Sequence, residues 1–155
     1  METSTKAAVV AGLAGAGTLN LIHETARRFI PNAPHVHEVA MQANQRFVFS
    51  PLGIQLSKRN LYLATLAGDL VSNSVFYAAV VNGMGRSDQN SVWKRATLFG
   101  LGAGVLTVIL PPLAGLKQQP TRNFAKTATL TAAWYLLGSL VAAAGFNASR
   151  AFNDH

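Results

Sequence analysis

Four long stretches of the chain carry almost no charged side chains, and this pattern constrains the fold more than any other feature. The stretches cover residues 7–23, 61–85, 96–116 and 127–149, and Asp69 is the single charged residue within them. About 20 helical residues span the roughly 30 Å hydrocarbon core of a bilayer. The first stretch is the shortest and needs flanking charged side chains to snorkel toward the headgroups. We therefore predict membrane spans at about 7–27, 61–83, 96–115 and 127–147.

A soluble helical bundle is the alternative that the composition has to exclude. Charged residues make up 12% of the 155 residues, against roughly 25% in an ordinary soluble domain. A soluble helix of this length would also show a charged stripe at 3.6-residue spacing, and none of the four stretches has one. The predicted fold is all-α, a polytopic membrane protein with four transmembrane helices in one bundle that forms a single domain over residues 1–155.

Cysteine is absent, so the sequence offers no disulfide framework, thiolate nucleophile or thiolate metal site. The N-terminal region carries Glu2 against Lys6, and its apolar run ends in His-Glu-Thr rather than in a small-residue cleavage site. We expect this run to be a retained first helix and not a signal peptide.

The basic residues indicate the orientation. Eight of the thirteen lie in the first and third polar segments, and five lie in the tails and the middle loop. The positive-inside rule then places both termini outside and the two more basic segments in the cytoplasm of a bacterium, as expected for a multi-pass inner-membrane protein. The net charge of +7 is spread over every polar segment, so we expect contact with membrane lipids, including anionic ones, and no nucleic-acid binding.

The cytoplasmic connecting segment 30–60 contains the sequence HVHEVAMQANQRF. Val36, Val39, Ala40, Ala43 and Phe47 fall on one side of a helix, which predicts a short amphipathic helix in the first loop. It lies either on the membrane surface or as a connecting helix packed under the bundle, and the two interpretations are equally supported.

Two histidines in this segment, His35 and His37, suggest a metal site only at first sight. Residues two apart point to different sides of a helix, and no third ligand follows at a useful spacing. We expect both to be solvated, with no metal and no cofactor.

Small residues recur at four-residue spacing in three of the predicted helices and let membrane helices pack backbone to backbone. They support a tight bundle, a homo-oligomer or a contact with a partner membrane protein without choosing among them. The pairs are Gly12 and Ala16, Ala11 and Gly15, Gly100 and Gly104, and Gly138 and Ala142. Pro111 and Pro112 predict that the third helix bends or ends near the cytoplasm.

Asp69 lies ten residues from Arg59, about 15 Å along a helix and therefore near the middle of the membrane. A carboxylate at that depth requires a partner, water or a proton. Matching depths along the helices predicts that Asn20, Asn73 and Tyr135 bond it in a polar pocket open toward the cytoplasm. The candidate pocket or ligand-binding residues are Asn20, His23, Glu24, Asp69, Ser72, Asn73 and Tyr135.

Three classes of function compete for this pocket. The favoured class is a non-catalytic structural or interaction component, in which Asp69 joins helices through hydrogen bonds. The alternative is a small proton- or cation-conducting channel or transporter that uses Asp69 with Glu24 and His23. An enzyme is least favoured, because the chain has no nucleophile elbow, no phosphate-binding loop and no pair of deep carboxylates.

The segments LIHETARRFIPNAP and NLYLATLAGDLVSNSVFYA resemble small four-helix bacterial membrane proteins of unassigned function, a conserved hypothetical group. The shared features are a His-Glu-Thr motif that ends the first helix and a Gly-Asp before a Ser-Asn in the second. The resemblance covers most of the chain and implies a four-helix inner-membrane protein. It implies no activity, but it adds weight to a pocket around His23, Glu24, Asp69 and Asn73.

Overall fold

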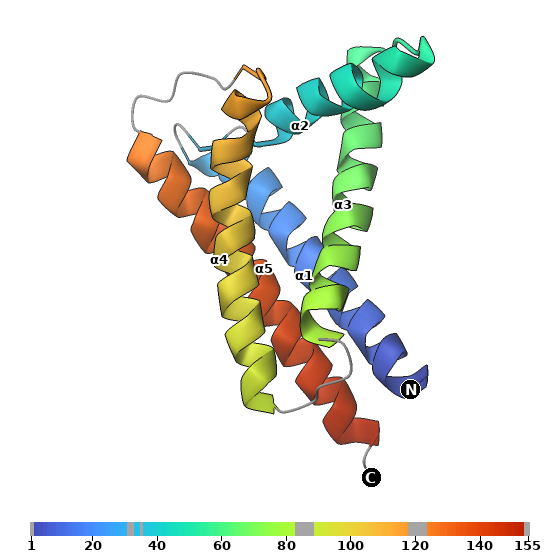
Figure 1. Cartoon of the computed structure of the whole chain (residues 1–155), viewed down its shortest axis with the longest axis vertical. Helices are drawn as coiled ribbons and strands as arrows, with labels where there is room; N and C mark the ends of the chain where they lie inside the picture. The colour runs from blue at the N-terminus through green and yellow to red at the C-terminus, as the bar shows by residue number, and fades with distance from the viewer. Residues whose placement is uncertain (1, 31–32, 35, 83–88, 118–123, 154–155) are drawn as a thin grey trace.

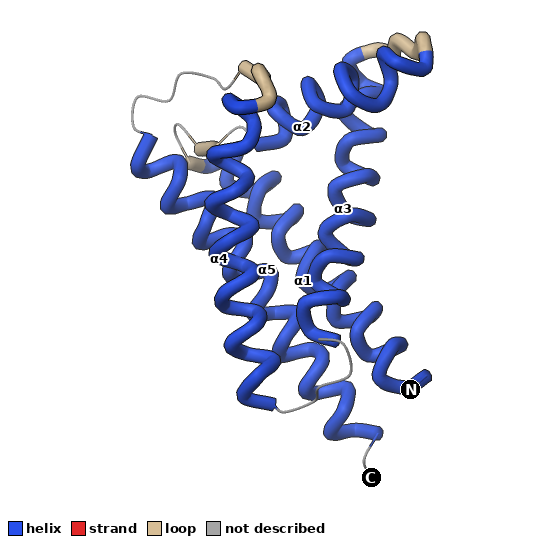
Figure 2. The backbone as a smooth tube through the Cα atoms, in the orientation of Figure 1, coloured by secondary structure: helices blue, strands red, loops and turns tan. Residues whose placement is uncertain are grey.

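The structure is a computed structural model that describes residues 2–30, 33–34, 36–82, 89–117 and 124–153. The described residues form helices and connecting turns with no strand (Figure 2). Four of the helices are long and apolar enough to cross a membrane. This confirms the predicted all-α fold with four candidate spans. The α-helices are α1 (Glu2–Phe29), α2 (Val36–Asn44), α3 (Lys58–Asn82), α4 (Gln89–Leu113) and α5 (Phe124–Asn153).

The two central helices, α1 and α5, cross each other, α3 packs along α1, and α4 packs along α5 (Figure 1). Helices α3 and α4 touch each other much less. Helix α1 begins and α5 ends at one end of the bundle, and α2 runs across the opposite end (Figure 1). The molecule therefore has a terminal end and an α2 end.

Small residues bring the helices together, as their spacing indicates. A Cβ atom added at Gly12 would meet the Ser74 carbonyl of α3. One added at Gly15 would lie 2.5 Å from the Gly138 carbonyl of α5. A Cβ at Gly104 of α4 would lie 2.5 Å from the Ala132 Cα, also on α5. The small-residue faces are thus used inside the chain, where close backbone approach gives membrane helices their packing contacts.

Large apolar side chains cover the outside of the bundle. Leu21 of α1 is 69% exposed, Val71 of α3 is 65% exposed and Leu98 of α4 is 70% exposed. A soluble protein rarely exposes apolar surface on this scale, whereas lipid tails are a matching solvent for it. The pattern of exposure agrees with four membrane-crossing helices.

The C-terminal end of α4 explains why two prolines lie inside it. The helix ends at Leu113, two residues before the predicted boundary, because Gly115 adopts a left-handed conformation with φ of 68°. The Leu116 N–H donates to the Pro111 carbonyl at 2.9 Å, and the Gly115 N–H donates to the Pro112 carbonyl at 3.0 Å. This is a Schellman motif, in which glycine takes the residue position that disfavours a side chain. The two prolines therefore lie in the last turn of the helix, and their carbonyls accept the hydrogen bonds of the motif that ends it.

The first polar segment folds as α2, then a π-helical turn η1 (Gln45–Phe49) and a 3₁₀ turn η2 (Ser50–Leu52). Gly53 then adopts φ of 70° and reverses the chain toward α3. The predicted short helix is therefore present in this loop, and its nine residues begin shortly after the buried Pro34.

Candidate functional site

A cavity of ≈490 Å³ lies at the α2 end of the bundle, between the four long helices and beneath α2. Six of the seven candidate residues line it, and Glu24 does not. Helix α1 contributes Asn20 and His23, α3 contributes Asp69, Ser72, Asn73 and Phe76, and α5 contributes Thr127, Thr131 and Tyr135. These residues are grouped in the sequence by their depth along the predicted helices, and six of the seven lie together in the fold. That they bind a ligand stays a prediction.

Helix α2 closes this cavity from one side. Its apolar residues Val36, Val39, Ala40 and Ala43 are part of the cavity lining. The sequence leaves two interpretations open, a helix on the membrane surface and a connecting helix packed under the bundle. These four residues pack against the bundle, as in the second interpretation. The fifth predicted member of the apolar face, Phe47, is 53% exposed and lies beyond α2 in η1.

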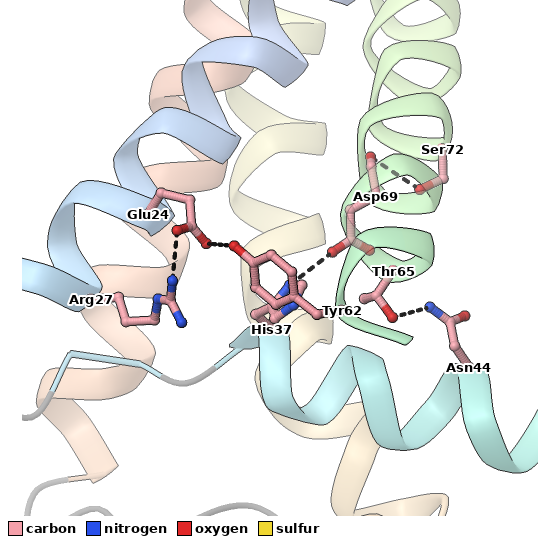
Figure 3. Close-up of polar contacts among 8 residues, drawn as sticks. All are labelled: Glu24, Arg27, His37, Asn44, Tyr62, Thr65, Asp69 and Ser72. Atoms are coloured by element: carbon pink, nitrogen blue, oxygen red, sulfur yellow. Dashed lines mark hydrogen bonds and ion pairs between the residues drawn. The ribbon is translucent and has the colours of Figure 1, made fainter. Parts of the chain in front are cut away.

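Three side-chain contacts hold α2 and η1 in place. The Asn44 side-chain amide donates to the Thr65 hydroxyl of α3 at 3.1 Å (Figure 3). The Gln42 amide donates to the Lys117 carbonyl at 3.0 Å and accepts from the Lys117 N–H at 3.3 Å. The Arg46 guanidinium donates to the Gly115 carbonyl at 3.1 Å. Helix α2 is thereby tied to the start of α3 and to the end of α4.

The opening of the cavity lies between α3 and α4. Among its lining residues, those that are exposed are Ser72 of α3 and Leu106 and Leu110 of α4. Figure 1 shows these two helices standing apart beneath α2. The predicted opening toward the cytoplasm stays a prediction. Helix α2 covers this end of the cavity, and the exposed lining residues lie between α3 and α4.

The Asp69 carboxylate has a different neighbour from those predicted. Its Oδ2 atom lies 3.9 Å from Nδ1 of His37 (Figure 3). Within the described part of the chain, no hydrogen bond joins this carboxylate to Asn20, Asn73 or Tyr135. Ser72 donates to the backbone carbonyl of Asp69 at 3.3 Å and not to its carboxylate. The predicted partners share the cavity with Asp69 without bonding to it.

His37 is not solvated, contrary to expectation. Its side chain is 13% exposed, and its ring packs edge-on against Tyr62 at a centroid distance of 4.5 Å. Burial lowers the pKa of His37 below its usual 6.5, and Arg27 lowers it further, while Glu24 and Glu38 act in the opposite direction. The imidazole beside Asp69 is therefore neutral at pH 7. The other histidine of the pair, His35, lies outside the described residues.

Glu24 lies outside the cavity, and both of its carboxylate oxygens accept hydrogen bonds. Arg27 donates to its Oε2 at 2.8 Å, and the Tyr62 hydroxyl donates to its Oε1 at 3.0 Å (Figure 3). The Arg27 guanidinium also lies 5.7 Å from the centre of the Tyr62 ring. These contacts join α1 to α3 through a paired carboxylate. The sequence does not single out Tyr62, because nothing in its spacing relates it to Glu24.

Two polar atoms of the cavity wall are buried without a partner among the described residues. They are Nε2 of His23 and Oγ1 of Thr131, and both residues line the cavity. The His23 ring packs edge-on against Trp134 at 5.1 Å, while Thr131 is fully buried. Unsatisfied buried polar atoms are rare, and a ligand or water commonly satisfies them.

No group of three metal-binding side chains occurs among the residues that the structure describes. Comparisons with protein-family models, curated proteins and solved structures found no match to this chain.

Proposed function

We propose that this protein is a non-catalytic, multi-pass component of a bacterial inner membrane whose intramembrane cavity binds a small ligand. The observation that carries the proposal is the ≈490 Å³ cavity, whose lining includes one carboxylate and two residues with a buried polar atom that has no partner in the described part of the chain. Ligand sites commonly enclose about 300–1,000 Å³ and combine apolar walls with a few convergent polar groups. The cavity meets both conditions.

The alternative is conduction or transport of protons or cations through Asp69, Glu24 and His23. Two observations weigh against it. Glu24 lies outside the cavity and is paired with Arg27 and Tyr62. Toward the terminal end, Gly15 and Gly138 bring α1 and α5 into backbone contact, and Tyr77 fills the remaining space between them. A cavity with one packed end supports binding better than passage.

Cysteine labelling tests whether the cavity is hydrated and accessible. The chain has no native cysteine, so a single thiol reports on one place, and only the ionised thiol reacts. We expect Ala103→Cys, in the cavity wall, to react with N-ethylmaleimide in membrane vesicles. Two control thiols should remain unlabelled. Val105→Cys is exposed on the outside of α4, where it faces lipid and stays un-ionised, and Ser139→Cys is fully buried.

Equal labelling of Ala103→Cys and Val105→Cys would contradict the proposed cavity. The transport alternative has its own readout, the pH- or cation-driven flux in proteoliposomes. We expect no flux above that of empty liposomes, and a flux that Asp69→Asn abolishes would establish the alternative instead.

The inner-membrane topology is tested separately with a membrane-impermeant maleimide. Leu52 is 69% exposed in η2, at the α2 end of the molecule. If that end is cytoplasmic, as the basic residues suggest, Leu52→Cys should react in inverted vesicles and not in right-side-out ones. The reverse pattern would invert the proposed topology.

A further inference from the structure

The walls of the cavity differ in chemistry from side to side. Apolar residues of α2 and α4 form one part of the lining, including Val39, Ala40, Leu106 and Leu110. Polar residues of α1, α3 and α5 form the other, including Asp69. A ligand that satisfies both sides needs an apolar body and a polar head.

The polar side carries one acidic group. Asp69 is the single acidic residue of the described lining, which contains no lysine or arginine. The His37 imidazole lies 3.9 Å from the carboxylate, and it is neutral at pH 7 because burial disfavours its charged form. The Asp69 side chain is 33% exposed, so its carboxylate is partly desolvated. A partly desolvated carboxylate without a nearby cation favours a cationic ligand over a neutral or anionic one.

Glu24 is a carboxylate near the same end of the bundle whose hydrogen-bond donors come from the chain itself. It accepts from Arg27 at 2.8 Å and from Tyr62 at 3.0 Å, so both oxygens are paired within the chain. Among the described residues, the carboxylate oxygens of Asp69 have no equivalent donors. The ammonium group of a ligand would supply such a donor.

Two further groups can hold the head of the ligand. Nε2 of His23 and the hydroxyl of the fully buried Thr131 have no partner in the described part of the chain and belong to the same cavity. Both atoms are buried, so each side chain must rotate toward the cavity to contact a polar atom of the head or its bound water. This observation is independent of the charge on Asp69.

The lateral opening indicates the route of entry. The exposed lining residues lie on α3 and α4, which are both long and apolar enough to span a membrane. A gap between two such helices faces lipid rather than water. A ligand that enters there is one that dissolves in the bilayer.

We propose that the cavity binds a small amphiphilic ammonium compound that enters from the bilayer between α3 and α4, places its cationic head on Asp69 and lays its apolar chain against α2. This inference rests on the proposed binding function and names the class of ligand for it.

Protection of the cavity thiol tests the proposal. The probes are hexylammonium, hexanol and hexanoate, which share one chain length and differ in head group. In the Ala103→Cys background we expect hexylammonium to slow N-ethylmaleimide labelling at concentrations about tenfold lower than hexanol, as one charge-assisted hydrogen bond provides. Hexanoate should protect least.

Two variants in the same background separate the cavity carboxylate from effects of surface charge. Asp69→Asn should remove the preference for hexylammonium while its labelling without probe shows that the cavity persists. Glu24→Gln should keep the preference, because Glu24 does not line the cavity. Persistence of the preference in Asp69→Asn overturns the assignment of Asp69.

The remaining outcomes test the ligand class and the cavity separately. Equal protection by all three probes, or protection by none of them, overturns the ligand class while the binding cavity stands. Absence of labelling at Ala103→Cys without any probe contradicts the cavity itself, and with it the proposed function.

Discussion

The two ends of the bundle are built in opposite ways from the same helices. Toward the terminal end, glycines allow α1 and α5 to touch backbone to backbone, with Gly15 facing Gly138 and with Tyr77 donating to the Tyr135 carbonyl at 3.1 Å. At the α2 end, a separate helix with apolar side chains lies across the bundle and leaves a cavity of ≈490 Å³. Residue size along each helix therefore decides where the bundle is solid and where it is hollow.

The same contrast applies to the two carboxylates near the α2 end. Glu24 has two donors from the chain, whereas Asp69 faces a neutral imidazole at 3.9 Å. A protein that needed Asp69 only to join helices would gain most by pairing it as Glu24 is paired. A carboxylate that faces a cavity without such donors favours a binding role over a structural one.

The largest effect should come from filling the tight contact between α1 and α5. In Gly15→Ala the new Cβ would lie 2.5 Å from the Gly138 carbonyl and 3.0 Å from Tyr77. Overpacking against backbone should lower the free energy of unfolding by about 2–3 kcal/mol. Thermal unfolding in detergent, followed by circular dichroism, measures this.

The matched control lies two residues away on the same helix. A Cβ added at Gly17 would meet nothing within 4 Å, so Gly17→Ala should be neutral or stabilising, by up to about 1 kcal/mol. Equal destabilisation by both substitutions would show that the loss of glycine flexibility, and not the contact, matters.

Two arginines extend the comparison to the ends of the bundle. At the terminal end, Arg95 of α4 donates to the Val80 carbonyl at 3.0 Å and to the Val81 carbonyl at 3.2 Å, both in the last turn of α3. Arg95→Met should cost about 1.5–2 kcal/mol, because charged hydrogen bonds to partly buried carbonyls are lost. Chemical or thermal unfolding provides the measurement.

Arg46 provides the counterpart at the α2 end, where it is exposed and donates to the Gly115 carbonyl. Arg46→Met should cost less than about 1 kcal/mol, as exposed charged pairs do. It should instead increase labelling of Ala103→Cys, because α2 is held less firmly over the cavity. Unchanged labelling would mean that the Gln42 and Asn44 contacts hold α2 without Arg46.

The helices themselves follow from local patterns in the sequence. Charge-free length marks a candidate span, and residues four apart share a face, so the sequence alone assigns Gly12 and Gly15 to helix contacts. Depth along the helices likewise groups Asn20, Asp69 and Tyr135, because the rise per residue is constant.

The contacts that depend on α2 do not follow from such patterns. The sequence pattern assigns His37 to solvent and does not single out Tyr62, yet one lies beside Asp69 and the other bonds Glu24. Both positions depend on the path of α2 across the bundle, which is set by long-range contacts such as Asn44 to Thr65. Local periodicity carries no information about such a path.

A smaller effect distinguishes the two carboxylates directly. A double-mutant cycle of Glu24→Gln with Tyr62→Phe should give a coupling energy of about 0.5–1.5 kcal/mol, because the two groups share a hydrogen bond of 3.0 Å. The cycle of Asp69→Asn with His37→Gln should give a coupling close to zero at pH 7, because the imidazole is neutral and 3.9 Å away. Equal coupling in the two cycles would remove the distinction on which the ligand proposal depends.

The smallest effect is a pH dependence that His37 imposes at the α2 end. Burial holds its pKa below the usual 6.5, so the folded protein takes up this proton less readily than the unfolded chain does. As the pH falls below about 6.5, the unfolded chain becomes protonated first. The contribution of neutral His37 to stability is therefore present above that pH and is lost progressively below it. Unfolding measured between about pH 7.5 and 5.5 should show a shallower decline in His37→Gln than in the wild type.

A matched substitution at the terminal end separates this titration from a general loss of packing. Tyr77→Phe should lower stability by a similar amount at every pH in this range, because the tyrosine hydroxyl does not titrate there. Identical pH profiles for the wild type and His37→Gln would place the imidazole in contact with water. They would also indicate that water surrounds the neighbouring Asp69, and a hydrated carboxylate binds a cationic ligand less strongly.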